Sequence, residues 1–203
     1  MTDVGLMYNN GMGATQDLDQ GRIWLTKTQR PTRTRAAEQD PGLAQGDIGN
    51  MYLFGRGVPQ DFTKALEYLL KSANQGHATA QHDLGIMYFN GYGVDQIFSV
   101  AFEWFLKAAE HGNARAQSSV GLMYSEGQGT FQNYSKAVDW LRKAAEQGDV
   151  QAQFGLGNAY FIGKGVEKDV ANAREWYSLA AGQGHEEART FLQHIQNNGA
   201  LQH

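Results

Sequence analysis

Small and apolar residues recur along the chain with the spacing of amphipathic helices. In the segment that begins at His77, they stand at positions i, i+4, i+7 and i+8, which places them on one face of a helix. This spacing predicts a helix over about 77–89, called helix A below. The residues of its apolar face are Ala80, Leu84, Met87 and Tyr88.

A second helix is predicted after a short glycine turn. Gly91 and Gly93 interrupt the first helix, because glycine takes the positive φ of a tight turn without a steric penalty. Apolar residues then return at spacings of three and four and predict a second helix, helix B, that ends near His111 before Gly112. The apolar face of helix B consists of Ala101, Trp104, Phe105, Ala108 and Ala109.

This pair of helices recurs every 36 residues. A fixed period of roughly 20 to 50 residues indicates a stacked array, and the function of such an array is expected on a surface that successive repeats share. The positions that keep the period are Tyr52, Tyr88, Tyr124 and Tyr160, then Gly55, Gly91, Gly127 and Gly163, then Gly57, Gly93, Gly129 and Gly165, and the closing Gly76, Gly112, Gly148 and Gly184.

The residue nine positions after each repeated tyrosine predicts where helix B begins. Asp61, Asn133 and Asp169 stand at this position in three repeats. Each can cap the helix by accepting a hydrogen bond from a free backbone N–H, which stabilises the helix by about 1 kcal/mol. The remaining repeat has Ile97 there, so we expect a frayed helix start or capping by Asp95.

A glycine also recurs inside helix A, where it costs about 1 kcal/mol relative to alanine. Its recurrence predicts points at which two helix backbones approach closely. These glycines are Gly49, Gly85, Gly121 and Gly157.

Together these positions resemble the Sel1-like repeat, a relative of the tetratricopeptide repeat. The resemblance implies an all-α, right-handed α-solenoid of antiparallel helix hairpins. It also implies a non-enzymatic scaffold or adaptor that binds an extended peptide or a helix, as in ubiquitin-ligase, protein-degradation or signalling complexes. The residues that carry it are Ala116-Gln117, Val120-Gly121, Met123-Tyr124, Gly127, Gly129, Lys136-Ala137, Trp140, Lys143-Ala144-Ala145 and Gly148.

The repeat pattern predicts three parts of the chain. Residues 1–35 read as a degenerate first repeat, incomplete at its N-terminal side and with a basic insertion. Residues 36–183 read as four repeats with breaks near 76, 112 and 148, and residues 184–203 as a capping helix and tail. Because solenoids need a polar cap on their end units, we expect an upstream segment in the natural chain, and end-to-end self-association stays open.

Composition excludes several classes of function. With 17 basic and 21 acidic residues the formal net charge is -4, which argues against nucleic acid or an anionic membrane as partner. The sequence contains no cysteine, which favours a reducing compartment and predicts a cytoplasmic location. No apolar run is long enough for a signal sequence or a membrane span, so no membrane insertion is expected.

The sequence offers little catalytic chemistry, and we predict no enzyme, no cofactor and no metal. The six histidines form no H-E-x-x-H motif, and no lysine follows a serine by three positions. The alternatives are a hydrolase of a cell-wall or β-lactam-like substrate, which some cysteine-rich relatives imply, and a structural spacer. Asn133 begins a glycosylation sequon, but it is already explained as a helix cap.

Partner contacts are expected on the concave side of the array, from helix A positions whose residue type changes between repeats. Three such positions form an i, i+4, i+8 stripe, and apolar groups exposed together there would mark a contact site. Packing between neighbouring helices is the alternative for the apolar members. The predicted stripe consists of Asn50, Phe54, His82, Ile86, Asn90, Ser118, Leu122, Glu126, Phe154, Asn158 and Ile162.

Overall fold

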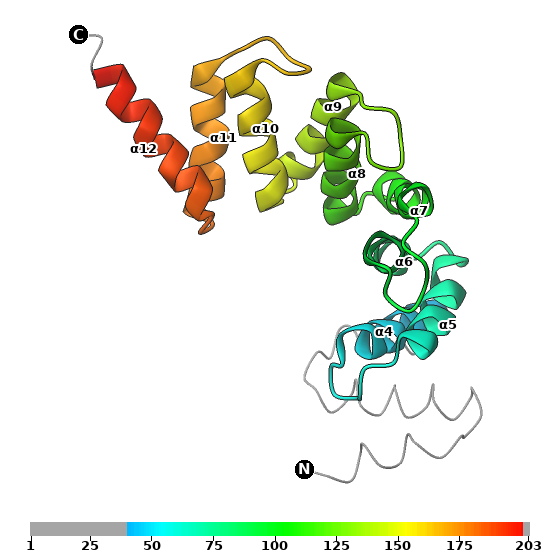
Figure 1. Ribbon diagram of the computed structural model, residues 1–203. Helices are drawn as coiled ribbons and strands as arrows, with labels where there is room; N and C mark the ends of the chain where they lie inside the picture. Colours follow the sequence, from blue (N-terminus) through cyan, green and yellow to red (C-terminus); the bar gives the residue numbers. More distant parts are fainter. Residues whose placement is uncertain (1–39, 201–203) are drawn as a thin grey trace. The chain divides into compact units, whose positions relative to one another are not determined.

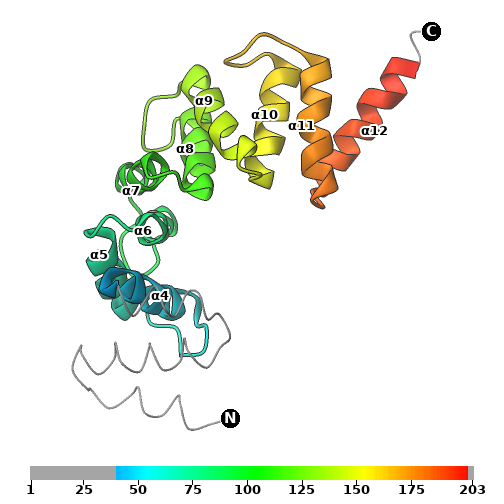
Figure 2. The ribbon, with the colours of Figure 1, turned by 180° about the vertical axis from the view of Figure 1, so that it is seen from behind.

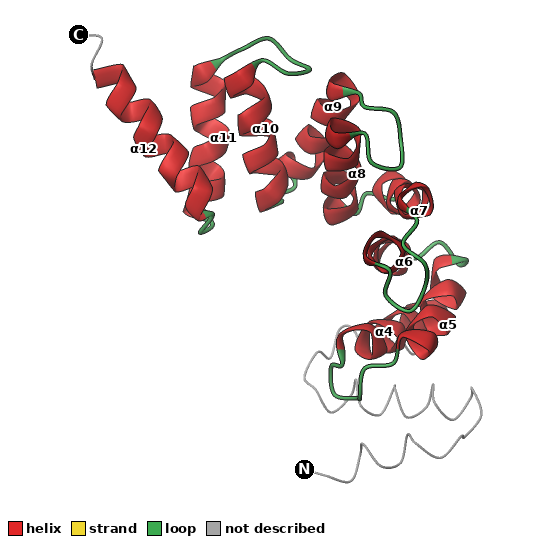
Figure 3. Cartoon of the chain, viewed as in Figure 1, coloured by secondary structure: helices red, strands yellow, loops and turns green. Residues whose placement is uncertain are grey.

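The computed structural model describes residues 40–200, with side chains as far as residue 195. Within this range every regular element is an α-helix, and only loops connect the helices (Figure 3). This confirms the predicted all-α class. The predicted incomplete repeat of residues 1–35 lies outside the described residues.

The helices belong to two compact units that divide between Ile97 and Phe98. In the first unit, α5 packs against both α4 and α6. In the second unit, each helix from α7 to α12 packs against the next one along the chain (Figures 1 and 2). The helices are α4 (Pro41–Phe54), α5 (Phe62–Ala73), α6 (Ala78–Asn90), α7 (Phe98–Glu110), α8 (Ala114–Glu126), α9 (Tyr134–Glu146), α10 (Val150–Ile162), α11 (Val170–Gly182) and α12 (Glu186–Ala200).

The predicted N-caps of helix B are confirmed. The side chain of Asp61 accepts a hydrogen bond from the backbone N–H of Lys64 at 3.0 Å, and Asn133 accepts one from Lys136 at 3.0 Å. Asp169 accepts from the backbone of Asn172 and from its side-chain amide, and these bonds hold the pKa of the Asp169 carboxyl below its ordinary value.

A backbone hydrogen bond also fixes the nine-residue distance between each repeated tyrosine and the start of helix B. In each described repeat the tyrosine carbonyl accepts a hydrogen bond from the backbone N–H of the residue that precedes helix B. The loop between the two helices can therefore lose or gain no residue without breaking this bond. The bonds join Asp61 to Tyr52, Ile97 to Tyr88, Asn133 to Tyr124 and Asp169 to Tyr160, at 2.8–3.0 Å.

The paired turn glycines have two separate roles. Gly91 and Gly93 adopt φ values of 72° and 68°, as the turn prediction requires. The second glycine of the pair also contacts the preceding repeat: a Cβ atom on Gly165 would overlap the carbonyl oxygen of Tyr134 at the start of α9. The turn therefore packs one repeat onto the one before it.

Gly121, inside helix A of its repeat, marks a close contact with the backbone of helix B, as predicted. A Cβ atom on Gly121 would lie 2.7 Å from Cγ of Leu141 and 3.1 Å from the backbone oxygen of Ala137. A Cβ atom on Gly157 would lie 2.7 Å from the ring of Tyr177, so the close neighbour there is a side chain and not the backbone. A side chain at either position would force the neighbouring atoms of helix B to shift.

Candidate partner-binding groove

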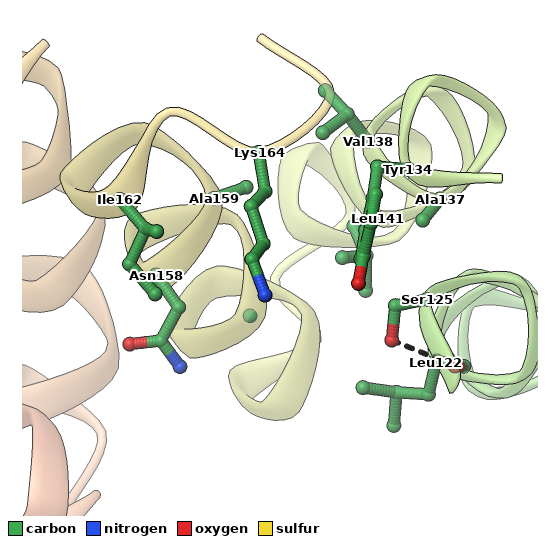
Figure 4. Close-up of a pocket in the computed structure, with 11 residues that line it drawn as sticks. Leu122, Ser125, Tyr134, Ala137, Val138, Leu141, Asn158, Ala159, Ile162 and Lys164 are labelled. Atoms are coloured by element: carbon green, nitrogen blue, oxygen red, sulfur yellow. Dashed lines mark hydrogen bonds between the residues drawn. The ribbon is translucent and has the colours of Figure 1, made fainter. Parts of the chain in front are cut away.

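A groove with a volume of about 250 Å³ opens between α8 and α10 in the second unit (Figure 4). Both of these helices are A helices of successive repeats, and α9 lies behind them. The lining residues are Leu122 and Ser125 of α8, Tyr134, Ala137, Val138 and Leu141 of α9, Gly155, Asn158, Ala159 and Ile162 of α10, and Lys164 of the following turn.

The apolar lining is buried at the back of the groove and exposed at its sides. Ala137, Val138 and Leu141 of α9 are buried and form the floor. Leu122 on one side is 39% exposed, and Ile162 on the other is 58% exposed. Two large aliphatic side chains thus face water beside an apolar floor, an arrangement that is stabilised when a partner covers it.

Three polar groups in the groove have bonding capacity left. The hydroxyl of Tyr177 donates to Oδ1 of Asn158 at 2.6 Å, which leaves the Nδ2 group of Asn158 without an acceptor among the described residues. Tyr134 makes no side-chain hydrogen bond within the same range. The ammonium of Lys164 lies 5.1 Å from the centre of the Tyr134 ring and pairs with no described carboxylate.

The fold positions Lys164 closely. This residue stands between Gly163 and Gly165, which both have positive φ, and its backbone N–H donates to the carbonyl of Ala159 at 3.1 Å. The contact of Gly165 with Tyr134 brings the turn against α9. Figure 4 shows the side chain of Lys164 projecting into the groove between Asn158 and Tyr134.

The structure brings together three residues of the predicted stripe, Leu122, Asn158 and Ile162, in this groove. Glu126 is exposed at the last position of α8. His82 and Ser118 are buried, with exposed fractions of 8% and 4%. A partner therefore has little access to either of these two side chains.

Phe154 packs inside the second unit. Its ring lies 4.4 Å from the ring of His185, 5.8 Å from that of Tyr177 and 6.0 Å from that of Phe191, measured between centroids. Phe154 therefore fits the alternative given for the apolar stripe residues, which is packing between neighbouring helices and not partner binding. Removing this ring would disturb α11 and α12 as well as any surface.

The other stripe residues lie in the first unit. Asn50 donates to the buried carboxylate of Asp83 at 2.8 Å, which joins α4 to α6. Phe54 is 40% exposed, and the guanidinium of Arg56 lies 4.9 Å above its ring. Ile86 is half-buried, and Asn90 is exposed, with its amide donating to the carbonyl of Ile86 at 2.9 Å.

The stripe analysis missed the groove residues that do not belong to the chosen helix A positions. Lys164 stands where the other repeats have Arg56, Tyr92 and Gln128, between two constant glycines. Gly155 stands where they have Asp47, Asp83 and Ser119, and its missing side chain leaves room over Leu141. The signal was present for Lys164, because its position changes between repeats while the glycines on both sides of it are constant.

The described residues hold no cluster of three or more histidine, aspartate or glutamate side chains that could bind a metal ion. Among the described helices, none is long and apolar enough to span a bilayer.

Paired helices that recur with a constant step define an α-helical repeat protein. The chain belongs to the Sel1 repeat family, whose model matches residues 1–28, 42–77, 78–113, 114–149 and 150–185. Proteins of this family are generally non-catalytic scaffolds that bind other proteins. A search of curated proteins found no match.

Solved structures support the same family. The chain is 39% identical to a protective antigen present in uropathogenic Escherichia coli strains, with a TM-score of 0.75, over 83% of this chain and 36% of that one. A Sel1 repeat protein from Oxalobacter formigenes is 33% identical, with a TM-score of 0.70, over 80% and 65%. The chain thus spans less than two thirds of both proteins. Cysteine-rich protein B of Helicobacter pylori is 25% identical, with a TM-score of 0.52, over 66% and 96%.

Proposed function

We propose that this chain is a non-enzymatic adaptor that binds a peptide segment or helix of a partner protein in the groove between α8 and α10. The observation that carries this proposal is the exposure of Leu122 and Ile162 on opposite sides of a floor of buried apolar residues. Covering such side chains yields about 25 cal/mol per Å² of apolar surface removed from water. No catalytic role is needed to explain the arrangement.

The proposal extends to the setting of the protein. The adaptor would act in a protein-degradation or signalling assembly in the cytoplasm, and a second copy of the chain remains a further partner. The absence of cysteine supports a reducing compartment. The hydrolase alternative receives no support from the groove, whose lining residues include no histidine or carboxylate.

Selection from a displayed library of random peptides against the immobilised full chain tests the proposal. Peptides that bind are then measured against the L122S/I162S double variant, with helicity checked by circular dichroism. Loss of two partly covered aliphatic side chains should weaken binding by at least about tenfold. Leu179→Ser is the matched control, because Leu179 is 52% exposed on α11 and does not line the groove.

The outcomes separate the adaptor from a structural spacer. Binding that falls in the double variant and persists in the Leu179 variant supports the adaptor and places its contacts in the groove. If no peptide is selected, or if every selected peptide binds the double variant as tightly as the natural chain, the groove is not a peptide site. That result would favour the structural spacer.

A further inference from the structure

The volume of the groove limits what it can hold. Sites for drug-sized molecules usually have volumes of roughly 300 to 1,000 Å³. At about 250 Å³ and open to solvent, this groove suits one or two side chains of a larger partner better than a whole small molecule. The apolar floor favours an aliphatic side chain in it, with Leu122 and Ile162 packed on either side.

The unpaired polar groups favour an extended partner over a helical one. The Nδ2 group of Asn158 is a donor held in place by the bond from Tyr177 to Oδ1. In a helix, nearly all backbone carbonyls are already bonded inside the helix, and only the last four are free. The carbonyls of an extended segment are available, so an extended segment can accept from Asn158 while its side chain fills the floor.

The charge in the groove specifies the partner further. Lys164 is the one charged residue among those that line the groove, and its ammonium pairs with no described carboxylate. The whole chain carries a net charge of -4, so it does not attract acidic partners at long range. At physiological salt, charges interact over only about 8 Å. A carboxylate would therefore be recognised locally, beside Lys164.

We propose that the groove selects an extended peptide segment in which an aliphatic side chain is followed closely by a carboxylate. The aliphatic side chain lies on the α9 floor, Asn158 donates to a backbone carbonyl of the segment, and Lys164 pairs with the carboxylate. This inference rests on the proposed function and specifies the chemistry of the partner at the same site.

Three fluorescein-labelled decapeptide libraries test the inference on the full chain. Each library has leucine fixed at its centre and random neighbours, and the residue two positions after the leucine is glutamate, glutamine or lysine. Side chains two positions apart in an extended segment lie on the same face. We expect the glutamate library to bind about fivefold more tightly than the lysine library in fluorescence anisotropy, the upper range for a partly exposed ion pair.

A charge reversal identifies the residue responsible. Lys164→Glu should make the lysine library the tightest of the three. Lys143→Glu is the matched control, because Lys143 also lies over an aromatic ring, 4.1 Å from that of Trp140, and does not line the groove. The control should keep the preference for glutamate. A preference that reverses in both variants would reflect net charge and would overturn the inference.

The result distinguishes failure of the inference from failure of the adaptor proposal. If all three libraries bind equally and Leu122→Ser weakens all of them, the groove binds peptides without regard to charge, and only the inference fails. If none binds, or if Leu122→Ser changes nothing, the adaptor proposal fails with it. Proline placed directly after the leucine tests the extended form: an extended segment should tolerate it, and a bound helix should lose affinity.

Discussion

The side-chain amide of Gln147, just after α9, donates a hydrogen bond to Oε1 of Gln117 in α8 at 2.7 Å. Gln117 in turn donates to the backbone carbonyl of Ala109 in α7 at 3.1 Å. One buried glutamine thus connects three consecutive helices. The same pair of positions is bonded in other repeats, between Gln75 and Gln45 at 2.9 Å and between Gln183 and Gln153 at 2.9 Å.

Replacement of Gln117 should therefore destabilise the second unit. Gln117→Ala removes both bonds from a residue that is 5% exposed and leaves the amide of Gln147 without this acceptor. Net losses of about 1 to 2 kcal/mol are typical for such a change. Urea denaturation followed by circular dichroism measures it. Gln151→Ala, at an exposed position of α10, is the control and should leave the free energy of unfolding within about 0.5 kcal/mol.

The internal glycines give a prediction that runs against helix propensity. Alanine favours a helix over glycine by about 1 kcal/mol, yet Gly121→Ala would place a Cβ 2.7 Å from Leu141. We expect a net loss of stability of about 1 to 3 kcal/mol from this overpacking. Gly182→Ala meets no atom within 4 Å and should be neutral or stabilising. Equal effects of the two substitutions on the urea midpoint would contradict the inference that a side chain at position 121 clashes with Leu141.

The helices were predictable from the sequence because their signals are local. The predicted helix of 77–89 is Ala78–Asn90 in the structure, and helix B ends at Glu110, one residue before the predicted His111. Apolar spacing, caps and turn glycines act within a few residues of one another. The contact of Gly165 with the preceding repeat could not be predicted in this way, since it joins residues 31 positions apart.

The candidate site was less predictable because residues four positions apart in a helix do not all point in the same direction. With about 3.6 residues per turn, each step of four residues rotates the side chain by about 40°. In α8 this rotation takes the stripe from Ser118, which is 4% exposed, through Leu122 at 39%, to the exposed Glu126. Only the later members of the stripe reach the surface. Lys164, which follows α10 in a turn, lies outside any pattern of helix periodicity.

Phe154 and Ile162 should behave oppositely, although both are apolar members of one stripe. Phe154→Ser removes a ring packed against His185, Tyr177 and Phe191, so we expect a loss of about 2 to 4 kcal/mol in unfolding free energy. Ile162→Ser changes a side chain that is 58% exposed and should leave stability within about 0.5 kcal/mol.

Urea denaturation of both variants, with peptide binding measured in parallel, separates packing from recognition. Unchanged stability in the Phe154 variant would show that the packing of Phe154 against Tyr177, His185 and Phe191 does not stabilise the second unit. Reduced stability in the Ile162 variant would instead make Ile162 part of the core and weaken its assignment to the groove.

Tyr177 predicts a loss of stability at alkaline pH. Burial raises the pKa of its hydroxyl to about 12, whereas an unfolded tyrosine titrates near about 10. The folded chain therefore holds this proton more tightly, and the stability is fully present below about pH 10 and lost as the pH rises toward about 12. The full difference corresponds to roughly 3 kcal/mol.

Tyr177→Phe isolates this effect from the titration of lysines in the same range. Unfolding free energies of both chains between pH 9 and about 12 should fall, and the fall should be shallower in the variant because it lacks the ionisable hydroxyl. The variant also loses the bond that holds Oδ1 of Asn158 at 2.6 Å. Asn158 would then be free to turn its amide away from the groove, so peptide affinity at neutral pH should fall although Tyr177 does not line the groove. Parallel alkaline slopes in the two chains would show that Tyr177 ionises as it does in the unfolded state, and an unchanged peptide affinity would show that Asn158 needs no support from α11.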